Sequence, residues 1–263
     1  MEILPADRPE AFVLRLDGMD QSLVDLSDPT RLVFDYVRRI GDVIDAHAPA
    51  GVPLRVLHVG GAGLSLPRYV AATRPRSAQV VLEPDADLVE HVRAALPLPA
   101  RSGIKIRVVD GRSGIGALRE AAMDLVVVDA FARGRMPAEL TTTPFWQEVA
   151  RVLRPDGRLV ANLVDDAPFR HARRVIAGIR SALPELVVTA EPATLRGRRQ
   201  GNLVVVASRV PGVSIAAALG AAATRAGAPY RVLDSPAVSD TLGGGTPFTD
   251  ANAEAGPAPR SAR

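Results

Sequence analysis

The chain has 263 residues, of which 47% are hydrophobic and 23% charged, a composition that can build a packed core and excludes wholesale disorder. It has no cysteine, which excludes disulfides, cysteine-ligated zinc, iron–sulfur clusters and thiol nucleophiles. The net charge is only +3, and every basic residue except Lys105 is an arginine, which indicates genomic composition bias. Aromatic residues make up 4% of the chain, too few for a base-stacking platform, so no nucleic-acid partner is expected.

The sequence predicts neither a secretory signal nor a membrane span. The first ten residues, MEILPADRPE, are acidic and interrupted by proline, whereas a secretory signal is basic and then apolar. The longest uncharged stretch, residues 210–224, is too short to cross a bilayer. We therefore expect a cytoplasmic protein with no membrane partner.

Residues 1–50 are predicted to form a β-hairpin and a helix. Residues 11–26, AFVLRLDGMDQSLVDL, alternate apolar and polar side chains around an Asp-Gly turn, which is typical of a hairpin. The segment 27–47 has apolar residues at helical spacing, with Asp28 as the expected N-cap and Pro29 at the first helical position.

Between residues 51 and 210, apolar runs of strand length alternate with segments of helical period. The runs are LRVLHV, AQVVL, IKIRVV, DLVVV, RLVANLV, LVVTA and NLVVVAS. This alternation predicts parallel strands joined by helices, while the turn-rich connection PATLRGRRQG predicts that the last two strands pair antiparallel. The expected fold class is α/β, with a Rossmann-like, seven-stranded methyltransferase-type sheet whose last strand is antiparallel.

Residues 211–263 are expected to be an Ala/Gly-rich extension that ends in a disordered tail. Residues 234–263 are rich in Pro, Gly, Ala, Ser and Thr and carry almost no large apolar side chains. Such a segment buries too little surface to offset its ordering entropy.

Glycines follow the first strand of the predicted central sheet. Gly60, Gly61 and Gly63 lie between LRVLHV and a helix that begins near Leu64. Glycine lets a ligand approach the backbone without meeting a Cβ, and a helix N-terminus offers free N–H groups. The carboxyl ends of parallel strands are where open α/β sheets bind ligands. The alternative interpretation is a tight strand-to-helix connection.

Acidic residues end the next three strands. Glu83 ends the second strand, where a carboxylate can accept hydrogen bonds from two vicinal ribose hydroxyls. Asp110 and Gly111 close the third strand, placed for an adenine amino group and for close packing on the ring, although an ordinary Asp-Gly turn is the alternative. Asp129 closes the fourth strand. Because these ends meet at one crevice, the sequence predicts a nucleoside-binding site there.

Other residues indicate less chemistry. The four histidines have no paired-ligand spacing, so no metal site is expected. Phe145 and Trp146 are expected in the core, with a wall of the substrate site as the alternative. The arginines at 196, 198 and 199 favour a solvated hairpin tip, with nucleic-acid contact as the alternative. Asp165 and Asp166, just past the fifth strand, could hold a cationic acceptor or form a solvated turn or N-cap.

The motifs VLHVGGAG, LEPD, VVDG, VVVDAF and LRPDGRLVANL together resemble the spermidine synthase (polyamine aminopropyltransferase) family, within the S-adenosylmethionine-dependent methyltransferase superfamily. The segment LDGMDQSLVDLSDPTRLVFDYVRRI is similar to the family's N-terminal hairpin and places its Gln and Tyr at Gln21 and Tyr36. The resemblance covers about 200 residues and is closest to a divergent actinobacterial branch. It implies a homodimer, and a polyamine or another small molecule as acceptor.

Residue roles follow from these patterns and the resemblance. S-adenosylmethionine or its decarboxylated form would be bound as cosubstrate by Gly60, Gly61, Gly63, Glu83, Asp110, Gly111 and Asp129. Gln21, Tyr36 and Asp165 would contact the acceptor, and Asp129 and Tyr36 would take part in catalysis.

The chain departs from the family pattern at three places. Family members that make spermidine carry an aspartate at the position of Gly63 and a catalytic aspartate at that of Ala132, and their Tyr-His-Glu cluster is Tyr36-Val37-Arg38 here. A decarboxylated cosubstrate has only cationic groups beyond the ribose, so a lost charged hydrogen bond should weaken it by about 1.5–3 kcal/mol. Loop N–H groups could instead hold the carboxylate of S-adenosylmethionine.

Three functions stay open on these grounds. The leading hypothesis is a spermidine synthase-like transferase that binds S-adenosylmethionine, its decarboxylated form or methylthioadenosine, with aminopropyl transfer unresolved. The second is an S-adenosylmethionine-dependent methyltransferase. The third is a catalytically silent nucleoside-binding protein.

Overall fold

A small antiparallel sheet precedes the main body of the protein. The computed structural model describes residues 1–210 and 215–259. The small sheet has the order β1-β2-β3 and consists of β1 (Glu2–Pro5), β2 (Ala11–Leu16) and β3 (Met19–Asp25). The predicted hairpin is confirmed in β2 and β3, and Asp17 and Gly18 turn between them with φ of 51° and 77°. The sequence did not predict β1, which pairs with β2.

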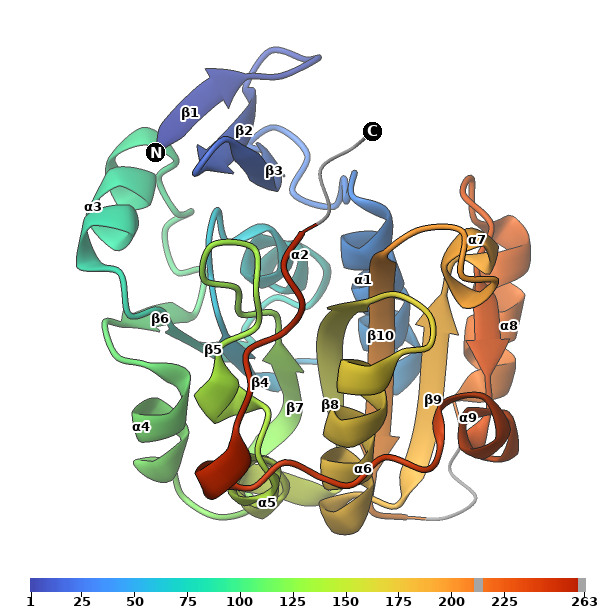
Figure 1. The fold of residues 1–263 in the computed structure, drawn as a ribbon. Coiled ribbons are helices and arrows are strands. Elements are labelled where there is room, and N and C mark those ends of the chain that lie inside the picture. The colour runs from blue at the N-terminus through green and yellow to red at the C-terminus, as the bar shows by residue number, and fades with distance from the viewer. Residues whose placement is uncertain (211–214, 260–263) are drawn as a thin grey trace.

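The main sheet contains the seven predicted strands and one more. Within the described ranges its order is β11-β9-β10-β8-β7-β4-β5-β6 (Figure 1). The strands are β4 (Arg55–Val59), β5 (Ala78–Leu82), β6 (Ile104–Arg107), β7 (Met123–Val128), β8 (Leu153–Asp165), β9 (Glu185–Ala190), β10 (Gly201–Ser208) and β11 (Arg231–Leu233). As predicted, β10 is antiparallel to both of its neighbours, while β8, β7, β4, β5 and β6 run parallel. The predicted α/β, Rossmann-like class is therefore confirmed, with β11 as an eighth strand at the edge.

Helices cover both faces of this sheet, with α1 behind it and α6 in front of it in Figure 1. The α-helices are α1 (Asp35–His47), α2 (Ser65–Thr73), α3 (Ala86–Ala95), α4 (Gly111–Gly116), α5 (Thr143–Val152), α6 (Arg170–Ala182), α7 (Pro192–Leu195), α8 (Ala216–Arg225) and α9 (Ser235–Leu242). The part of the chain that the structure describes also contains two short 3-10 helices, η1 (Ala138–Leu140) and η2 (Asp250–Asn252). One apolar cluster joins α1, α2 and α8 to the sheet, and another joins α5, α6 and α9 to the opposite face.

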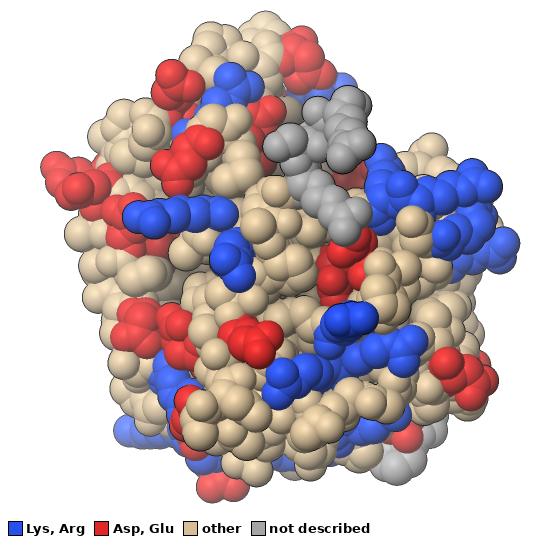
Figure 2. All heavy atoms as spheres, in the orientation of Figure 1, with Lys and Arg blue, Asp and Glu red and all other residues tan. Residues whose placement is uncertain are grey.

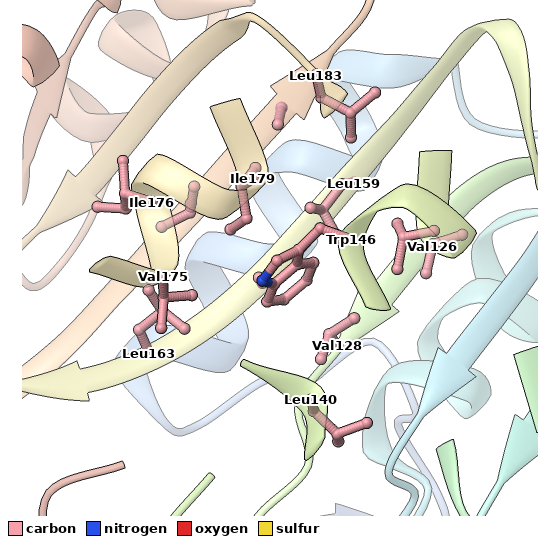
Figure 3. Close-up of a cluster of buried hydrophobic side chains, with 14 of the residues drawn as sticks. Val126, Val128, Leu140, Trp146, Leu159, Leu163, Val175, Ile176, Ile179 and Leu183 are labelled. Atoms are coloured by element: carbon pink, nitrogen blue, oxygen red, sulfur yellow. The ribbon is translucent and has the colours of Figure 1, made fainter. Parts of the chain in front are cut away.

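Trp146 lies at the centre of the second cluster, between α5, α6 and the strands β7 and β8 (Figure 3). Both Phe145 and Trp146 are fully buried, and their rings meet edge to face at a centroid distance of 4.9 Å. The indole N–H donates to the carbonyl of Thr141 over 3.1 Å, which satisfies the one polar atom of the ring. The expectation that both aromatics belong to the core is confirmed.

The first helix begins later than the sequence predicts. It starts at Asp35, with Phe34 as the N-cap, and not at Pro29 after an Asp28 cap. The Asp28 carboxylate instead accepts hydrogen bonds from the backbone and the hydroxyl of Thr30. Short acidic side chains satisfy nearby N–H groups in turns as readily as at helix starts, so the local pattern did not distinguish the two.

The prediction of a disordered tail is wrong for residues 234–259. This segment contains α9 and η2, and it crosses the front of the molecule past α6 and α5 (red in Figure 1). Its few large apolar side chains, Val238, Leu242 and Phe248, are fully buried. The segment is poor in apolar residues, but these three are enough to fix it because the main core already provides the apolar surface that they cover. Residues 211–214 and 260–263 of the predicted extension lie outside the described residues.

Candidate ligand-binding site

A cavity of about 420 Å³ lies at the carboxyl ends of the parallel strands. Its walls come from the ends of β4, β5 and β7, the starts of α1, α2 and α4, the β2–β3 hairpin, and the loop after β7. The size falls within the range typical of small-molecule sites. The cavity lies where the sequence placed a ligand, at the strand ends of an open α/β sheet.

The structure brings most of the predicted site residues to this cavity. The predicted residues that line it are Gln21, Tyr36, Gly60, Gly61, Glu83, Asp110, Gly111 and Asp129. Gly63 and Asp165 do not line it. Gln21 comes from β3 and Tyr36 from α1, so the front unit supplies part of a wall.

Gly60 allows the end of β7 to approach the end of β4. Its φ is +88°, and a Cβ at this position would stand 2.3 Å from the backbone oxygen of Asp129. Such a contact is impossible for any other residue without moving the backbone. The glycine therefore sets how close Asp129 lies to the loop that follows β4.

Glu83 connects two backbone segments at the cavity wall. Its Oε2 accepts a hydrogen bond from the N–H of Gly61 over 3.1 Å, and its Oε1 accepts one from the N–H of Asp85 over 3.2 Å. Because a carboxylate offers about four lone-pair directions, each oxygen keeps capacity for a further donor. The side chain is thus both an anchor of the glycine loop and an acceptor available to a ligand.

Asp110 has a structural partner as well as a place in the cavity. Its Oδ1 accepts from the N–H of Ser113 over 2.8 Å and so caps α4. The hydrogen bond from the backbone of Ser113 lowers the pKa of this carboxyl below its ordinary value. Asp110 therefore carries a negative charge at neutral pH.

Asp129 is a buried acid of the cavity whose pKa is raised. Burial raises the pKa of Asp129 to about 6, although Asn162 donates to its Oδ1 over 2.9 Å and favours the ionised form. Burial, with a smaller contribution from the Asp129 charge, raises the pKa of Tyr36 well above its ordinary value. Tyr36 is therefore a permanent hydroxyl donor, and Asp129 is suited to accept a proton.

Two further residues lie near Asp129 that the sequence did not predict to belong to the site. Asn162 is buried in β8 and holds Asp129, and His58 of β4 lines the cavity. The ring of His58 contacts Gln79 Oε1 over 2.9 Å, and burial lowers the pKa of His58 to about 4, so it is neutral at physiological pH. The signal was present: each is a lone polar residue inside an apolar strand.

Asp165 binds backbone N–H groups and does not line the cavity, where it was predicted to contact an acceptor. Its Oδ1 accepts from the N–H of Asp166 and its Oδ2 from the N–H of Ala172, both over 2.8 Å. The side chain is buried and fixes the turn into α6. The alternative of a turn or N-cap is therefore the one that the geometry favours.

The basic group near α7 is exposed at the upper right of Figure 2, where Lys and Arg side chains gather. Arg199 forms an ion pair there with Glu191. Among the described residues no cluster of three or more His, Asp or Glu has the arrangement of a metal site. No helix in the described part of the chain is long and apolar enough to span a membrane.

One solved structure matches nearly the whole chain. The crystal structure of a probable spermidine synthase from Corynebacterium glutamicum has a TM-score of 0.86 and 30% sequence identity, and the match covers 95% of this chain and 92% of that one. The chain belongs to the spermidine synthase family. The Corynebacterium relative also agrees with the actinobacterial branch that the sequence indicated.

Two further comparisons cover a smaller part of this spermidine synthase family member. The polyamine aminopropyltransferase of Chromobacterium violaceum is 28% identical over 143 residues, which is 54% of this chain and 53% of that protein, so the chain spans about half the length of that curated relative. The crystal structure of human methyltransferase-like protein 13 in complex with SAH has a TM-score of 0.55 at 22% identity, covers 71% of this chain and 90% of that one, and shows the shared fold alone. No protein-family model matches the sequence.

Two residues at which the sequence is predicted to depart from the family pattern have structural partners in this spermidine synthase family member. Gly63 donates its N–H to Ser22 Oγ over 3.1 Å, and a Cβ there would lie 2.8 Å from the Ser22 Cβ, so a longer side chain would push into β3. Arg38 donates to the carbonyls of Leu32 and Val33, which holds its charge on the loop before α1. Ala132 does line the cavity, and the position therefore offers no acid there.

Proposed function

We propose that the cavity binds S-adenosylmethionine, its decarboxylated form or methylthioadenosine, and that the protein transfers a group from the sulfonium to a small amine acceptor. The observation that carries this proposal is the meeting of Glu83, Asp110 and Asp129 in one cavity with Gln21 and Tyr36 of the front unit. Three carboxylates on successive strand ends and two polar side chains opposite them suit two ligands bound side by side.

The residues present fit a nucleoside. Glu83 would accept from the ribose hydroxyls, since both of its oxygens keep acceptor capacity, and Asp110 would accept from the adenine amino group. Leu88 and Leu140 provide apolar wall, as a purine requires. The start of α2 at Ser65 has no side-chain cap and lines the cavity, so the positive end of that helix would face a ligand bound there.

Group transfer from a sulfonium needs no general acid, because the leaving group is a neutral thioether. The acceptor nitrogen attacks the carbon beside the sulfonium, the new C–N bond forms as the C–S bond breaks, and the sulfur leaves as a neutral thioether with the electron pair. The nitrogen must lose a proton, which Asp129 would accept, while the hydroxyl oxygen of Tyr36 would accept a hydrogen bond from the amine and so orient the acceptor. The remaining contribution of the protein is to hold both reactants in line.

Which group is transferred is the finer part of the proposal. Ala132 leaves the cavity wall without an acid that would hold a cationic end, and the uncapped start of α2 suits a carboxylate. These observations favour S-adenosylmethionine at least as much as its decarboxylated form. Methyl transfer therefore stands beside aminopropyl transfer, and a protein that binds nucleoside without turnover is the third candidate.

Titration calorimetry with S-adenosylmethionine, decarboxylated S-adenosylmethionine and methylthioadenosine tests the proposal. We expect binding of at least one ligand by the wild type and at least tenfold weaker binding by Glu83→Ala. Turnover is then measured on a panel of di- and triamines with each cosubstrate, with S-adenosylhomocysteine and methylthioadenosine as product inhibitors. Absence of binding by all three ligands would refute the proposal, and binding without turnover would select the silent candidate.

The family resemblance extends the proposal to assembly and location. We propose that the protein is a cytoplasmic homodimer and that its acceptor is a small molecule of the polyamine class. Light scattering coupled to size-exclusion chromatography measures the assembly, and a monomeric mass at micromolar concentration would contradict it.

A further inference from the structure

One wall of the cavity is a loop held from two sides. We call residues 130–137 the wall loop; Ala130, Phe131, Ala132 and Pro137 are among its residues that line the cavity. It connects the end of β7 to η1. The segment 248–259, here the C-terminal strap, runs up the front of the molecule beside this loop (Figure 1).

The tip of the wall loop has a demanding backbone conformation. Ala132 and Arg135 exchange backbone hydrogen bonds of 2.8 and 3.1 Å, which closes a two-residue turn. The two central residues, Arg133 and Gly134, have φ of 52° and 71°. Left-handed backbone is unfavourable for arginine, so this turn needs support from outside the loop.

The strap provides that support through Arg135. Its Nε donates to the carbonyl of Gly256 over 2.6 Å and its Nη2 donates to that of Ala255 over 3.4 Å. In return, the N–H of Gly256 donates to the carbonyl of Met136 over 2.9 Å. Loop and strap are therefore joined by hydrogen bonds in both directions, two of them from one guanidinium.

The loop tip is enclosed as well as bonded. A Cβ on Gly134 would stand 2.4 Å from Pro259 Cγ and 3.1 Å from Met19 Cε. Met19 belongs to β3 and itself lines the cavity. The tip thus lies between the front hairpin and the strap, with room only for glycine.

The strap is in turn fixed to the core. Phe248 is fully buried, its carbonyl accepts from the N–H of Thr143 over 2.8 Å, and the guanidinium of Arg174 lies 3.7 Å from its ring centre. Arg112 of α4 forms two hydrogen bonds of 2.7 Å with the carboxylate of Asp250. These anchors lie before residue 254, so they do not depend on the contacts to the wall loop.

We propose that Arg135 is a positioning residue that, through the carbonyls of Ala255 and Gly256, fixes the wall loop in the shape that completes the acceptor side of the cavity. Arg135 is exposed and lies outside the cavity lining, so it acts through the loop and not on the ligand. The inference rests on the proposed function, because the acceptor is defined there. The strap is then a structural part of the site, although none of its residues lines the cavity.

Hydrogen exchange of the full chain, followed by mass spectrometry, tests the coupling without any ligand. Arg135→Met keeps the aliphatic stem and removes the donors, and we expect at least tenfold faster exchange in residues 130–137 with unchanged exchange in β7. Arg135→Lys restores one donor and should recover part of the protection. Arg154→Met is the matched control, because Arg154 is an exposed arginine paired with Asp124 away from the loop.

A truncation after residue 253 gives a second, independent variant. It keeps Phe248 and Asp250 in place and removes the partners of Arg135, so it should reproduce the exchange pattern of Arg135→Met while the melting temperature changes by only a few degrees. Unchanged exchange of the wall loop in both variants overturns the proposal.

The functional readout separates this inference from the proposed function. In a transferase that turns over, Arg135→Met should raise the KM of the acceptor at least fivefold, leave the affinity for methylthioadenosine within twofold, and recover with Arg135→Lys. Wild-type KM in Arg135→Met with a loosened loop would refute the positioning role. If the wild type binds no adenosyl ligand, the proposed function fails, and the exchange experiment still decides whether Arg135 fixes the loop.

Discussion

Asn162 Nδ2 donates a hydrogen bond to Asp129 Oδ1 over 2.9 Å, between the neighbouring strands β8 and β7. Asn162 is 2% exposed, and its own Oδ1 has no hydrogen-bond partner. A buried polar atom without a partner costs free energy, so the orientation of this amide favours the carboxylate at the expense of its own carbonyl. The unsatisfied carbonyl of Asn162 therefore lowers the stability of the fold, while its amide N–H fixes the Asp129 carboxylate at the cavity.

Replacing Asn162 by leucine should raise the pKa of Asp129 above about 6, because the hydrogen bond that favours its ionised form is lost while the burial remains. If activity needs the Asp129 carboxylate, the acidic limb of the pH–rate profile should move up by about one pH unit, as expected for a charged hydrogen bond. A limb that stays in place would show that another group controls it. His58 does not, because burial holds its pKa at about 4.

Asp129→Asn should make the protein more stable at alkaline pH and inactive as a transferase. The folded pKa of about 6 lies above the ordinary value of 3.8, so the folded state binds this proton more tightly than the unfolded state does. The stability from that proton is fully present below about pH 4 and is lost as the pH rises through 6. The asparagine still accepts from Asn162, and the variant should gain about 1–3 kcal/mol over wild type at pH 8 and almost nothing at pH 4. Urea unfolding of both proteins at the two pH values measures this. The prediction is contradicted if the difference in free energy of unfolding between the variant and the wild type is no larger at pH 8 than at pH 4.

Glu83→Gln and Glu83→Ala should separate the two tasks of Glu83. Glutamine keeps an oxygen for the N–H of Gly61, but it loses the charge, and its NH2 group cannot accept from the N–H of Asp85. We expect about tenfold weaker methylthioadenosine binding, or about 1.4 kcal/mol, and only a slightly lower melting temperature, because the lost hydrogen bond is exposed. Alanine also removes both backbone hydrogen bonds, so binding should be weaker still and the melting temperature a few degrees lower. Calorimetry and thermal unfolding measure the two effects, and wild-type affinity in both variants argues against contact with the ribose.

Tyr36→Phe should lower the efficiency with which the acceptor is used and leave nucleoside binding unchanged. The ring stacks on Phe34 at a centroid distance of 6.3 Å, and this packing survives the substitution. The lost hydroxyl should lower kcat/KM for the acceptor about tenfold, while the methylthioadenosine affinity and the free energy of unfolding stay within error. Steady-state kinetics with varied acceptor concentration measures this. An unchanged kcat/KM would show that the Tyr36 hydroxyl does not contact the acceptor.

Phe248→Ala should destabilise the protein by about 3–5 kcal/mol, the usual loss for a fully buried phenylalanine. A disordered tail would give no change. Ala251→Ser, at an exposed position three residues further along, is the control and should unfold like wild type. Chemical denaturation of the three proteins measures the difference.

The strands and their functional ends were predictable because both depend on local patterns. Runs such as LRVLHV and DLVVV must be buried on both faces, and the residue that follows each run must emerge at the carboxyl edge of the sheet. Glu83, Asp110 and Asp129 therefore reached the cavity as expected. Gln21 and Tyr36 came from the family resemblance, since no periodicity places a separate hairpin over a sheet.

What the sequence could not predict depends on partners far along the chain. In the sequence Gly63 resembles a glycine of a ligand-binding loop, yet its N–H donates to Ser22. Asp165 resembles a free acid, yet its carboxylate accepts a hydrogen bond from the N–H of Ala172. The last segment looks too polar to fold, yet Phe248 fills a site made by α5 and α6. Composition gives the residues that a segment contains. Only the tertiary structure shows whether the rest of the protein offers an apolar surface on which those residues can pack.

Hydrophobic period and turn chemistry, which act within a few residues, thus determined the sheet, its helices and the acidic strand ends from the sequence alone. The closing of the cavity by the β2–β3 hairpin, the pairing of Asn162 with Asp129 and the hold of Arg135 on the strap were decided by tertiary packing. These contacts join residues that the chain separates by tens to more than a hundred positions, and their energies exist only after the sheet has brought them together.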